Sequence, residues 1–339
     1  MKAIVIAPDK SLLWQDVPDP VCAPGEVCIE IHAAGLNRAD LLQRDGRYPP
    51  PPGCPPWPGL EAAGIICAMS PEAAAEGRWK IGDRVCTLLG GGGYAEYVTV
   101  PSCMCMPIPA GLSMAEAAAL PEVFATAYLN LCLIGGAKAG DTLLMHAGGS
   151  GLASAVIPLA KSMNMRVITT VRGQAKAEAV QYLQADRVID TTVQSMAEVL
   201  REEEESGHPV DIAIDCLGGD MLGKSLPYVA RGCRWIVIAT LAGDISPVDF
   251  RNVYVKNIHL IGSTLRSKTP AEKGEILAAL TQNVWPKIAS GEIVPRIHKI
   301  LPITEAERAQ EMMKQGESIG KIILQVRDDS SSRTEEATL

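Results

Sequence analysis

The segment HAGGSGLASA, residues 146–155, separates two apolar runs and decides how the middle of the chain folds. It follows the strand-like run DTLLM and opens a helix-like run, with Gly148, Gly149 and Gly151 in the turn between them. Such a turn directs backbone N–H groups and the positive end of a helix at one point, where a pyrophosphate can bind. The strict G-x-G-x-x-G/A pattern is not met, because the last position counted from Gly149 is Ser154. A tight turn without a ligand is therefore the alternative interpretation.

Strand-like and helix-like runs alternate on both sides of this turn, from residue 121 to residue 268. The strand-like runs are DTLLMHA (141–147), RVITTV (166–171), RVID (187–190), DIAIDC (211–216), CRWIVIA (233–239) and IHLIGST (258–264). This alternation predicts an α/β fold with a doubly wound parallel sheet between helices. No G-x-x-x-x-G-K-[ST] segment is present, which argues against a kinase or ATPase phosphate loop.

A different rhythm marks residues 1–120, which we expect to form a compact β-rich domain. In EVCIEIHAAG (26–35) the apolar residues Val27, Ile29 and Ile31 fall on one strand face. The segment YPPPPGCPPWPG (48–59) holds seven prolines in twelve residues, so it predicts a stiff loop and neither a helix nor a central strand.

The C-terminal part, residues 269–326, reads as a helix followed by a strand pair. The helix is predicted over 270–291, and the strands are IHKILPI (297–303) and KIILQV (321–326). The polar residues 327–339 are predicted to be a disordered tail.

Composition and charge narrow the class of protein. The 339 residues are 47% hydrophobic, and 39 acidic against 31 basic residues leave a net charge of −8. This balance disfavours a nucleic-acid or membrane partner. No apolar run reaches the roughly 18 residues of a membrane span, and MKAIVIAPDK reads as a first strand instead of a signal peptide. We therefore expect a cytoplasmic protein.

The ten cysteines are scattered through apolar surroundings and predict free thiols, not a disulfide framework. Cys103 and Cys105 are separated by one residue, a spacing that points strand side chains to opposite faces and does not suit zinc. The five histidines also lack metal-ligand spacing. We therefore predict no metal site.

The end of the second strand of the alternating region indicates the nucleotide. TTVRGQAK (169–176) offers Arg172 and Lys176 and no acidic residue before Glu178. An NAD site usually carries a carboxylate here for the ribose 2′-OH, whereas a 2′-phosphate needs cations. NADPH is thus the favoured cofactor. Two solvated basic side chains are the alternative interpretation.

Several segments together resemble the quinone oxidoreductases of zeta-crystallin type, within the medium-chain dehydrogenase/reductase superfamily. They are GEVCIEIHAAGLNRADLLQRDGRYPPPPG, PGLEAAG, KIGDRVCTLLGGGGYAEYVTVP, HAGGSGLASA, DCLGG and GKIIL, in this order over residues 1–326. The wording LNRADLLQR, PEVFATAY and HAGGSG is most similar to the tumour-suppressor-inducible subgroup. The resemblance implies a GroES-like β-barrel domain completed by the C-terminal segment, plus a Rossmann domain.

The resemblance also implies the chemistry. Leu60 and Asn37 stand where zinc-dependent relatives have a histidine and a cysteine, so hydride transfer from NADPH to a quinone is expected without zinc. Tyr48 would donate a hydrogen bond to the acceptor, and Asn37 and Arg266 would polarise the acceptor or the nicotinamide amide. Asp40 would orient a neighbour. The alternatives are that Tyr48 only caps the proline loop and that Asp40 forms a salt bridge within the domain.

Further cofactor positions follow from the resemblance. Gly173 and Thr191 stand where relatives have a serine and a tyrosine near the 2′-phosphate, which would leave Lys176 with more of the preference. The remaining implied cofactor contacts are Gly149, Ser150, Gly151 and Leu152 in the turn, and Thr126, Thr240, Leu241, Ala242, Leu265 and Arg266 along the nicotinamide.

Other functions and the assembly stay open at this stage. A related NADPH-dependent reductase of enoyl thioesters or other α,β-unsaturated carbonyls is one alternative, and a non-catalytic NADPH-binding module is another. The predicted last strand, NIHLIGST (257–264), is a sheet edge that would pair with a second copy, so we expect a homodimer.

Overall fold

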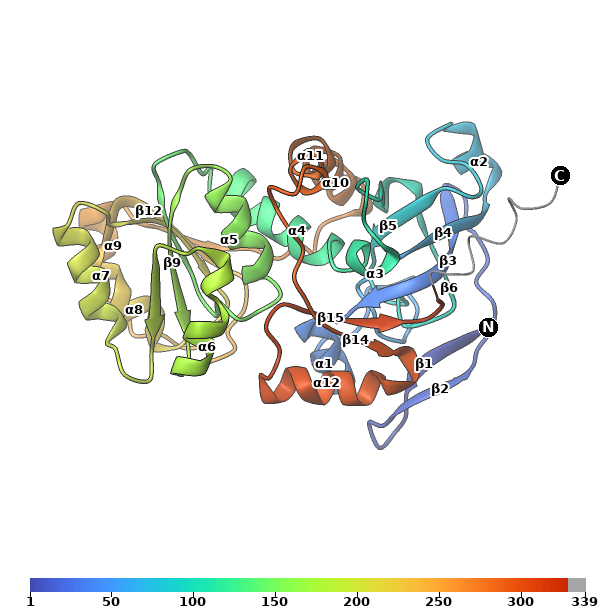
Figure 1. The fold of residues 1–339 in the computed structure, drawn as a ribbon, viewed down its shortest axis with the longest axis horizontal. Coiled ribbons are helices and arrows are strands. Elements are labelled where there is room, and N and C mark those ends of the chain that lie inside the picture. Colours follow the sequence, from blue (N-terminus) through green and yellow to red (C-terminus); the bar gives the residue numbers. More distant parts are fainter. Residues whose placement is uncertain (329–339) are drawn as a thin grey trace. The chain divides into compact units, whose positions relative to one another are not determined.

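The computed structural model describes residues 1–328 and divides into two compact units. Unit 1 comprises Met1–Ala125 and the segment that begins at Lys268, and unit 2 comprises Thr126–Ser267. Unit 2 contains the predicted parallel sheet and unit 1 is rich in antiparallel strands (Figure 1), so the predicted fold class is confirmed.

Unit 2 is built on a six-stranded parallel sheet with the order β10-β9-β8-β11-β12-β13. The strands are β8 (Thr142–Met145), β9 (Arg166–Val171), β10 (Arg187–Asp190), β11 (Val210–Asp215), β12 (Val229–Val237) and β13 (His259–Gly262). Each corresponds to one predicted run. Strand β8 lies between β9 and β11, so the strand order reverses there, which is where open α/β sheets bind ligands.

Helices cover both faces of this sheet. They are α5 (Ala153–Lys161), α6 (Gln174–Ala179), α7 (Met196–Glu205), α8 (Asp220–Ser225) and α9 (Phe250–Lys256). In Figure 1, α7 and α8 lie on one side of the strands and α5 on the other. On the α7 side, Val199 and Leu200 pack into a core with Trp235 of the sheet. The burial of apolar side chains between layers explains why both faces of these strands are apolar.

Unit 1 contains a seven-stranded sheet that closes around strand β3. The strands are β3 (Glu26–Gly35), β4 (Glu61–Met69), β5 (Arg84–Leu88), β6 (Tyr97–Pro101), β7 (Cys105–Pro107), β14 (Ile297–Pro302) and β15 (Lys321–Gln325), and a separate pair is formed by β1 (Lys2–Ile6) and β2 (Leu12–Asp16). β15 pairs antiparallel with β3, so the C-terminal segment completes the N-terminal sheet. Val27, Ile29 and Ile31 of β3 are all fully buried.

The helices of unit 1 differ from the prediction at one place. They are α1 (Arg38–Arg44), α2 (Pro71–Ala75), α3 (Met114–Ala117), α10 (Pro270–Asn283), α11 (Trp285–Ala289) and α12 (Ala306–Gln315). The single helix predicted over 270–291 is therefore wrong: it breaks at Val284 into α10 and α11. Pro286 has no N–H to donate and stands at the first turn of α11, where a proline is tolerated.

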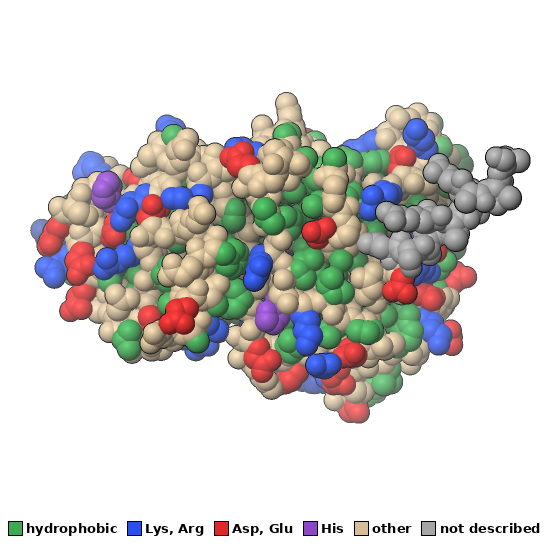
Figure 2. All heavy atoms as spheres, viewed as in Figure 1, with side chains coloured by type: hydrophobic (Ala, Val, Ile, Leu, Met, Phe, Trp, Pro, Cys, Tyr) green, Lys and Arg blue, Asp and Glu red, His purple; other side chains and the backbone are tan. Residues whose placement is uncertain are grey.

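A long helical segment runs from Met114 to Ile134 through α3, α4 (Pro121–Ala127) and the π-helical η2 (Tyr128–Ile134). Its 21 residues have a mean hydropathy of 1.5, enough by length and composition for a membrane span, but 72% of its most apolar window is buried in the protein. A core helix has the same composition. On the face shown in Figure 2, acidic and basic side chains are interspersed without a continuous field of either sign.

Short 3₁₀ turns complete the structure. They are η1 (Ser102–Met104), η3 (Gln181–Leu183), η4 (Leu226–Tyr228) and η5 (Ile303–Glu305). The predicted tail lies outside the described residues except for Arg327 and Asp328. The guanidinium of Arg327 donates to the carbonyl oxygens of Ile31 and Glu96 and stacks over the ring of Tyr97.

Candidate functional site

The turn after β8 has the geometry of an anion cradle. Ala147 adopts a left-handed φ of +58°, and the Gly148 N–H donates to the Thr170 carbonyl at 2.8 Å. A Cβ on Gly148 would lie 2.6 Å from Oγ1 of Thr169, so only glycine lets the turn pack this closely on β9. The Ser150 hydroxyl accepts from the N–H of Ala153 and caps the first turn of α5.

Three backbone donors of this turn have no acceptor among residues 1–328: the N–H groups of Gly149, Gly151 and Leu152. These residues are partly exposed and stand at the N-terminal end of α5, a helix of nine residues. Unpaired N–H groups at a helix N-terminus are the usual donor set for a phosphate. The residues present therefore fit the pyrophosphate of a dinucleotide.

The other predicted cofactor residues of unit 2 gather at the same edge of the sheet, because the carboxyl ends of parallel strands meet there. Thr240, Leu241 and Ala242 follow β12 and are exposed, whereas Leu265 is buried and Arg266 is half-buried in the turn after β13. The N–H groups of Leu241 and Ala242 donate to the loop after β11, at Cys216 and Leu217. Thr126 opens unit 2, and its carbonyl accepts from Asn130.

The predicted 2′-phosphate region lies at the end of β9. Arg172 is exposed, Lys176 is half-buried on α6, and Gly173 has a φ of +95°. The Thr191 hydroxyl donates to the Val171 carbonyl and is thus engaged with the backbone.

Asp190, at the end of β10, is a carboxylate in this region that the sequence reasoning missed. Its Oδ1 accepts from the N–H of Gly173 at 2.8 Å and from both the N–H and the hydroxyl of Thr192. The hydrogen bond from Gly173 is the main cause that lowers the pKa of Asp190, so the group is ionised at neutral pH. The signal was available in RVIDTT, because an aspartate followed by threonine at a strand end commonly caps the next turn.

In unit 1, Asn37 and Asp40 form the start of α1. Asn37 is the N-cap, its side chain and that of Asp40 form a capping box, and the Asn37 N–H donates to Asp40 at 2.7 Å. Asp40 is fully buried and also accepts from the Tyr94 hydroxyl and the Gly59 N–H. Burial raises the pKa of Asp40 to about 6. Among the described residues it has no basic partner within ion-pair distance; it orients the residues around it.

A buried ion pair holds the Asn37 side chain. Lys321 Nζ donates to Oε1 of Glu61 at 2.5 Å and to Oδ1 of Asn37 at 2.8 Å, and the Asn37 amide donates to the same Glu61 oxygen. The second carboxylate oxygen of Glu61 accepts from the N–H of Glu122. Both ends of the Asn37 amide are therefore engaged by charged groups of the protein.

The sequence reasoning did not select Glu61, Lys321 or Glu122. A signal existed, because Glu61 in GLEAAG and Lys321 in GKIILQV are single charges inside apolar runs, and buried charges are normally paired. Glu122 is half-buried, and burial, followed by the charge of Glu61, raises its pKa to about 7. Tyr48 is half-buried in the bend that opens the proline loop.

The donor set of unit 1 does not suit a dication. Leu60, at the position implied for a zinc ligand, is buried and apolar, and an ion near Asn37 would meet the Lys321 ammonium. Within residues 1–328, no group of three or more His, Cys, Asp or Glu side chains lies close enough to hold a metal ion.

Fold and turn together define a two-unit protein with a dinucleotide-type parallel sheet. Residues 23–110 match the alcohol dehydrogenase GroES-like domain family, and residues 151–282 match the zinc-binding dehydrogenase family. The chain belongs to the medium-chain dehydrogenase/reductase superfamily.

Among curated proteins, the chain is 30% identical over 310 residues to the lovastatin diketide synthase of Aspergillus terreus, but spans only 12% of that protein's length. It is 26% identical to a probable quinone oxidoreductase of Schizosaccharomyces pombe, covering 94% of this chain and 93% of the relative. A mycobacterial structure solved with NADPH is 27% identical and superposes with a TM-score of 0.85 over 96% of this chain and 100% of that one.

Proposed function

We propose that this protein is a zinc-independent NADPH:quinone oxidoreductase of zeta-crystallin type. The observation that carries the proposal is the similarity to the Schizosaccharomyces pombe probable quinone oxidoreductase over nearly the full length of both chains. A mycobacterial quinone oxidoreductase supports it, with a TM-score of 0.84 and 27% identity over 96% of this chain and 100% of that one.

In this proposal, the turn after β8 binds the dinucleotide. The N–H groups of Gly149, Gly151 and Leu152 would hold the pyrophosphate, and Arg172 and Lys176 would bind the 2′-phosphate. Asp190 does not compete for a ribose hydroxyl through Oδ1, because that oxygen already accepts three hydrogen bonds. NADPH, when bound, supplies the hydride.

The chain's own residues then bind and polarise the acceptor. Tyr48 would donate a hydrogen bond to the acceptor oxygen as negative charge develops there, and Arg266 would stabilise the same charge. Because Asn37 is held by Glu61 and Lys321, any contact with the acceptor would use the second hydrogen of its amide. Asp40, Glu61 and Lys321 act as positioning residues.

The charged Lys321 beside Asn37 supports the proposed independence from zinc. The cytoplasmic location, the small-molecule quinone as partner and the homodimer are further parts of this proposal. The homodimer would form through β13, since this edge strand has the exposed side chain of Leu260.

A second candidate is reduction of an enoyl thioester or another α,β-unsaturated carbonyl. The similarity to a short stretch of a large diketide synthase favours it, and the CurK enoyl reductase, at 23% identity and a TM-score of 0.80, shares the fold. A non-catalytic NADPH-binding module is the third candidate.

One assay separates these candidates. The purified chain is incubated with NADPH and, in parallel, an ortho-quinone, a para-quinone and an enoyl thioester, and NADPH oxidation is followed by absorbance. Faster turnover of a quinone supports the proposal. Preferential turnover of the thioester would replace it with the second candidate, and tight NADPH binding without any turnover would support the binding module.

A further inference from the structure

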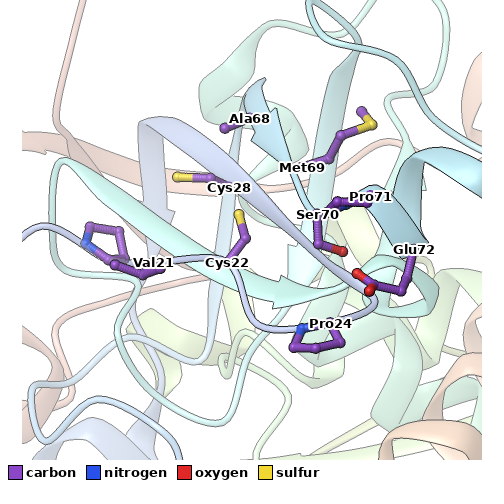
Figure 3. Close-up of a pocket in the computed structure, with 10 residues that line it drawn as sticks. Val21, Cys22, Pro24, Cys28, Ala68, Met69, Ser70, Pro71 and Glu72 are labelled. Carbon is purple, nitrogen blue, oxygen red and sulfur yellow. The ribbon is translucent and has the colours of Figure 1, made fainter.

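Three cysteines gather at the end of the β3–β4 pair that is remote from Asn37 and Glu61. Cys28 lies on β3, Cys67 on β4, and Cys22 in the loop before β3. Cys22 and Cys28 line a cavity of about 550 Å³ whose wall also contains Pro24 and Met69 (Figure 3). The sequence alone did not single out this cluster.

A β-bulge brings two of these thiols together. Cys28 pairs with Ala68 and Ile29 with Ile66, so Cys67 is the extra residue that stands beside Ala68, opposite Cys28. The Cys67 thiol donates to the carbonyl oxygen of Cys28 at 3.4 Å, and a side-chain hydrogen bond links the two thiols. Directly opposed residues of neighbouring strands have the Cα separation that a disulfide requires.

The two thiols differ in exposure. Cys67 is exposed, whereas Cys28 is 8% exposed and reaches solvent from the wall of the cavity. Burial is the main cause that raises the pKa of Cys28, so that thiol stays protonated at neutral pH and is slow to react with an oxidant. Cys67 is thus the first site of attack.

We propose that Cys67 and Cys28 form a reversible redox pair that closes into an intramolecular disulfide when the protein meets hydrogen peroxide. The Cys67 sulfur attacks the peroxide O–O bond, which gives a sulfenic acid at Cys67 and one water. The Cys28 sulfur then attacks the Cys67 sulfur; the S–S bond forms, the S–O bond breaks, and the hydroxyl leaves with the Cys28 proton as a second water. Two thiols lose two electrons in total, and one peroxide gains them.

Cys22 is the competing partner, and the structure disfavours it. Its loop is fixed over the end of β4 by the Gly25 N–H, which donates to the Ser70 hydroxyl at 2.9 Å. Burial and then the charge of Glu26 raise the pKa of the Cys22 thiol. Among the described contacts, the thiol hydrogen bond to Cys67 belongs to Cys28.

The test uses the full reduced chain, treated with hydrogen peroxide and then alkylated. Glutamate-specific digestion cuts after Glu26, Glu30, Glu61 and Glu72, so residues 27–30 carry only Cys28 and residues 62–72 carry only Cys67. Mass spectrometry is expected to find these two peptides joined, with two of the ten thiols lost and both regained after dithiothreitol. Cys67→Ser should abolish the cross-link, and Cys22→Ser should retain it.

Two outcomes would overturn the proposal. One is a cross-link that joins Cys67 to Cys22 and is lost in Cys22→Ser. The other is oxidation of Cys67 to a sulfinic or sulfonic acid with Cys28 still alkylated.

Discussion

Nζ of Lys321 lies 2.5 Å from Oε1 of Glu61, although 260 residues separate the two in the chain. Their side chains are 3% and 0% exposed. The pair is fully satisfied, because Lys321 also donates to the carbonyl oxygen of Leu36 and Glu61 also accepts from the N–H of Glu122. It ties the returning strand β15 to the N-terminal strands β3 and β4.

Removing one partner of this pair should be costly. Lys321→Met leaves the Glu61 carboxylate buried without a cation, and we expect the free energy of unfolding of unit 1 to fall by about 3 kcal/mol. Urea denaturation of the variant measures this. The double variant Lys321→Met with Glu61→Gln should recover part of the loss, and a single variant as stable as the parent would contradict the buried ion pair.

The stability of the protein should depend on pH through Glu122. Its pKa is raised from the usual 4.5 to about 7, so between these values the folded chain holds a proton that the unfolded chain has released. The free energy of unfolding therefore falls as the pH rises from about 5 to 7. Because Glu122 is half-buried, solvent screening limits the effect to about 1 kcal/mol.

Glu122→Gln isolates this contribution, since the amide does not titrate. The melting temperatures of the parent and of the variant should diverge as the pH rises from 5 to 8, with the variant becoming the more stable. Parallel curves for the two proteins would show that Glu122 keeps an ordinary pKa.

Lys176 should determine the preference for NADPH. Lys176→Ala is expected to raise the KM for NADPH about tenfold, the value of one hydrogen bond to a charged group, with a much smaller effect on the KM for NADH. Lys161→Ala is a matched control, because Lys161 pairs with Asp186 at the far end of α5. An equal effect of Lys176→Ala on both nucleotides would remove this residue from the 2′-phosphate site.

Tyr48 should act in turnover and not in cofactor binding. Tyr48→Phe removes the proposed hydrogen bond to the acceptor and should lower kcat by about tenfold or more, while the affinity for NADPH stays the same. Steady-state kinetics together with a fluorescence titration of NADPH separates the two effects. Unchanged turnover would leave Tyr48 as a residue of the proline loop only.

The edge strand β13 should form the dimer interface. In the described sheet it pairs only with β12, and the side chains of Leu260, Tyr254 and Phe250 are 41%, 66% and 70% exposed. Light scattering should give twice the chain mass for the parent and a shift toward one chain mass for Leu260→Lys. A parent protein that is monomeric at micromolar concentration would exclude this assembly.

The amino-acid sequence by itself determined the strands of unit 2, the glycine-rich turn and the return of the C-terminal segment to the first domain. These features depend on short-range patterns: alternation of apolar runs, a glycine turn between strand and helix, and charge at a strand end. The break between α10 and α11 was missed although Pro286 is a local signal, because the apolar pattern continues on both sides of it.

Only the tertiary structure decided which charged groups meet. Lys321 with Glu61, Asp190 with Gly173, and Cys67 with Cys28 are contacts between segments that are distant in the chain. A side chain's local sequence shows that it needs a partner, because burial of an unpaired charge or polar group is costly. Which partner it finds depends on strand order, register and bulges, and these are fixed only when the whole sheet has formed.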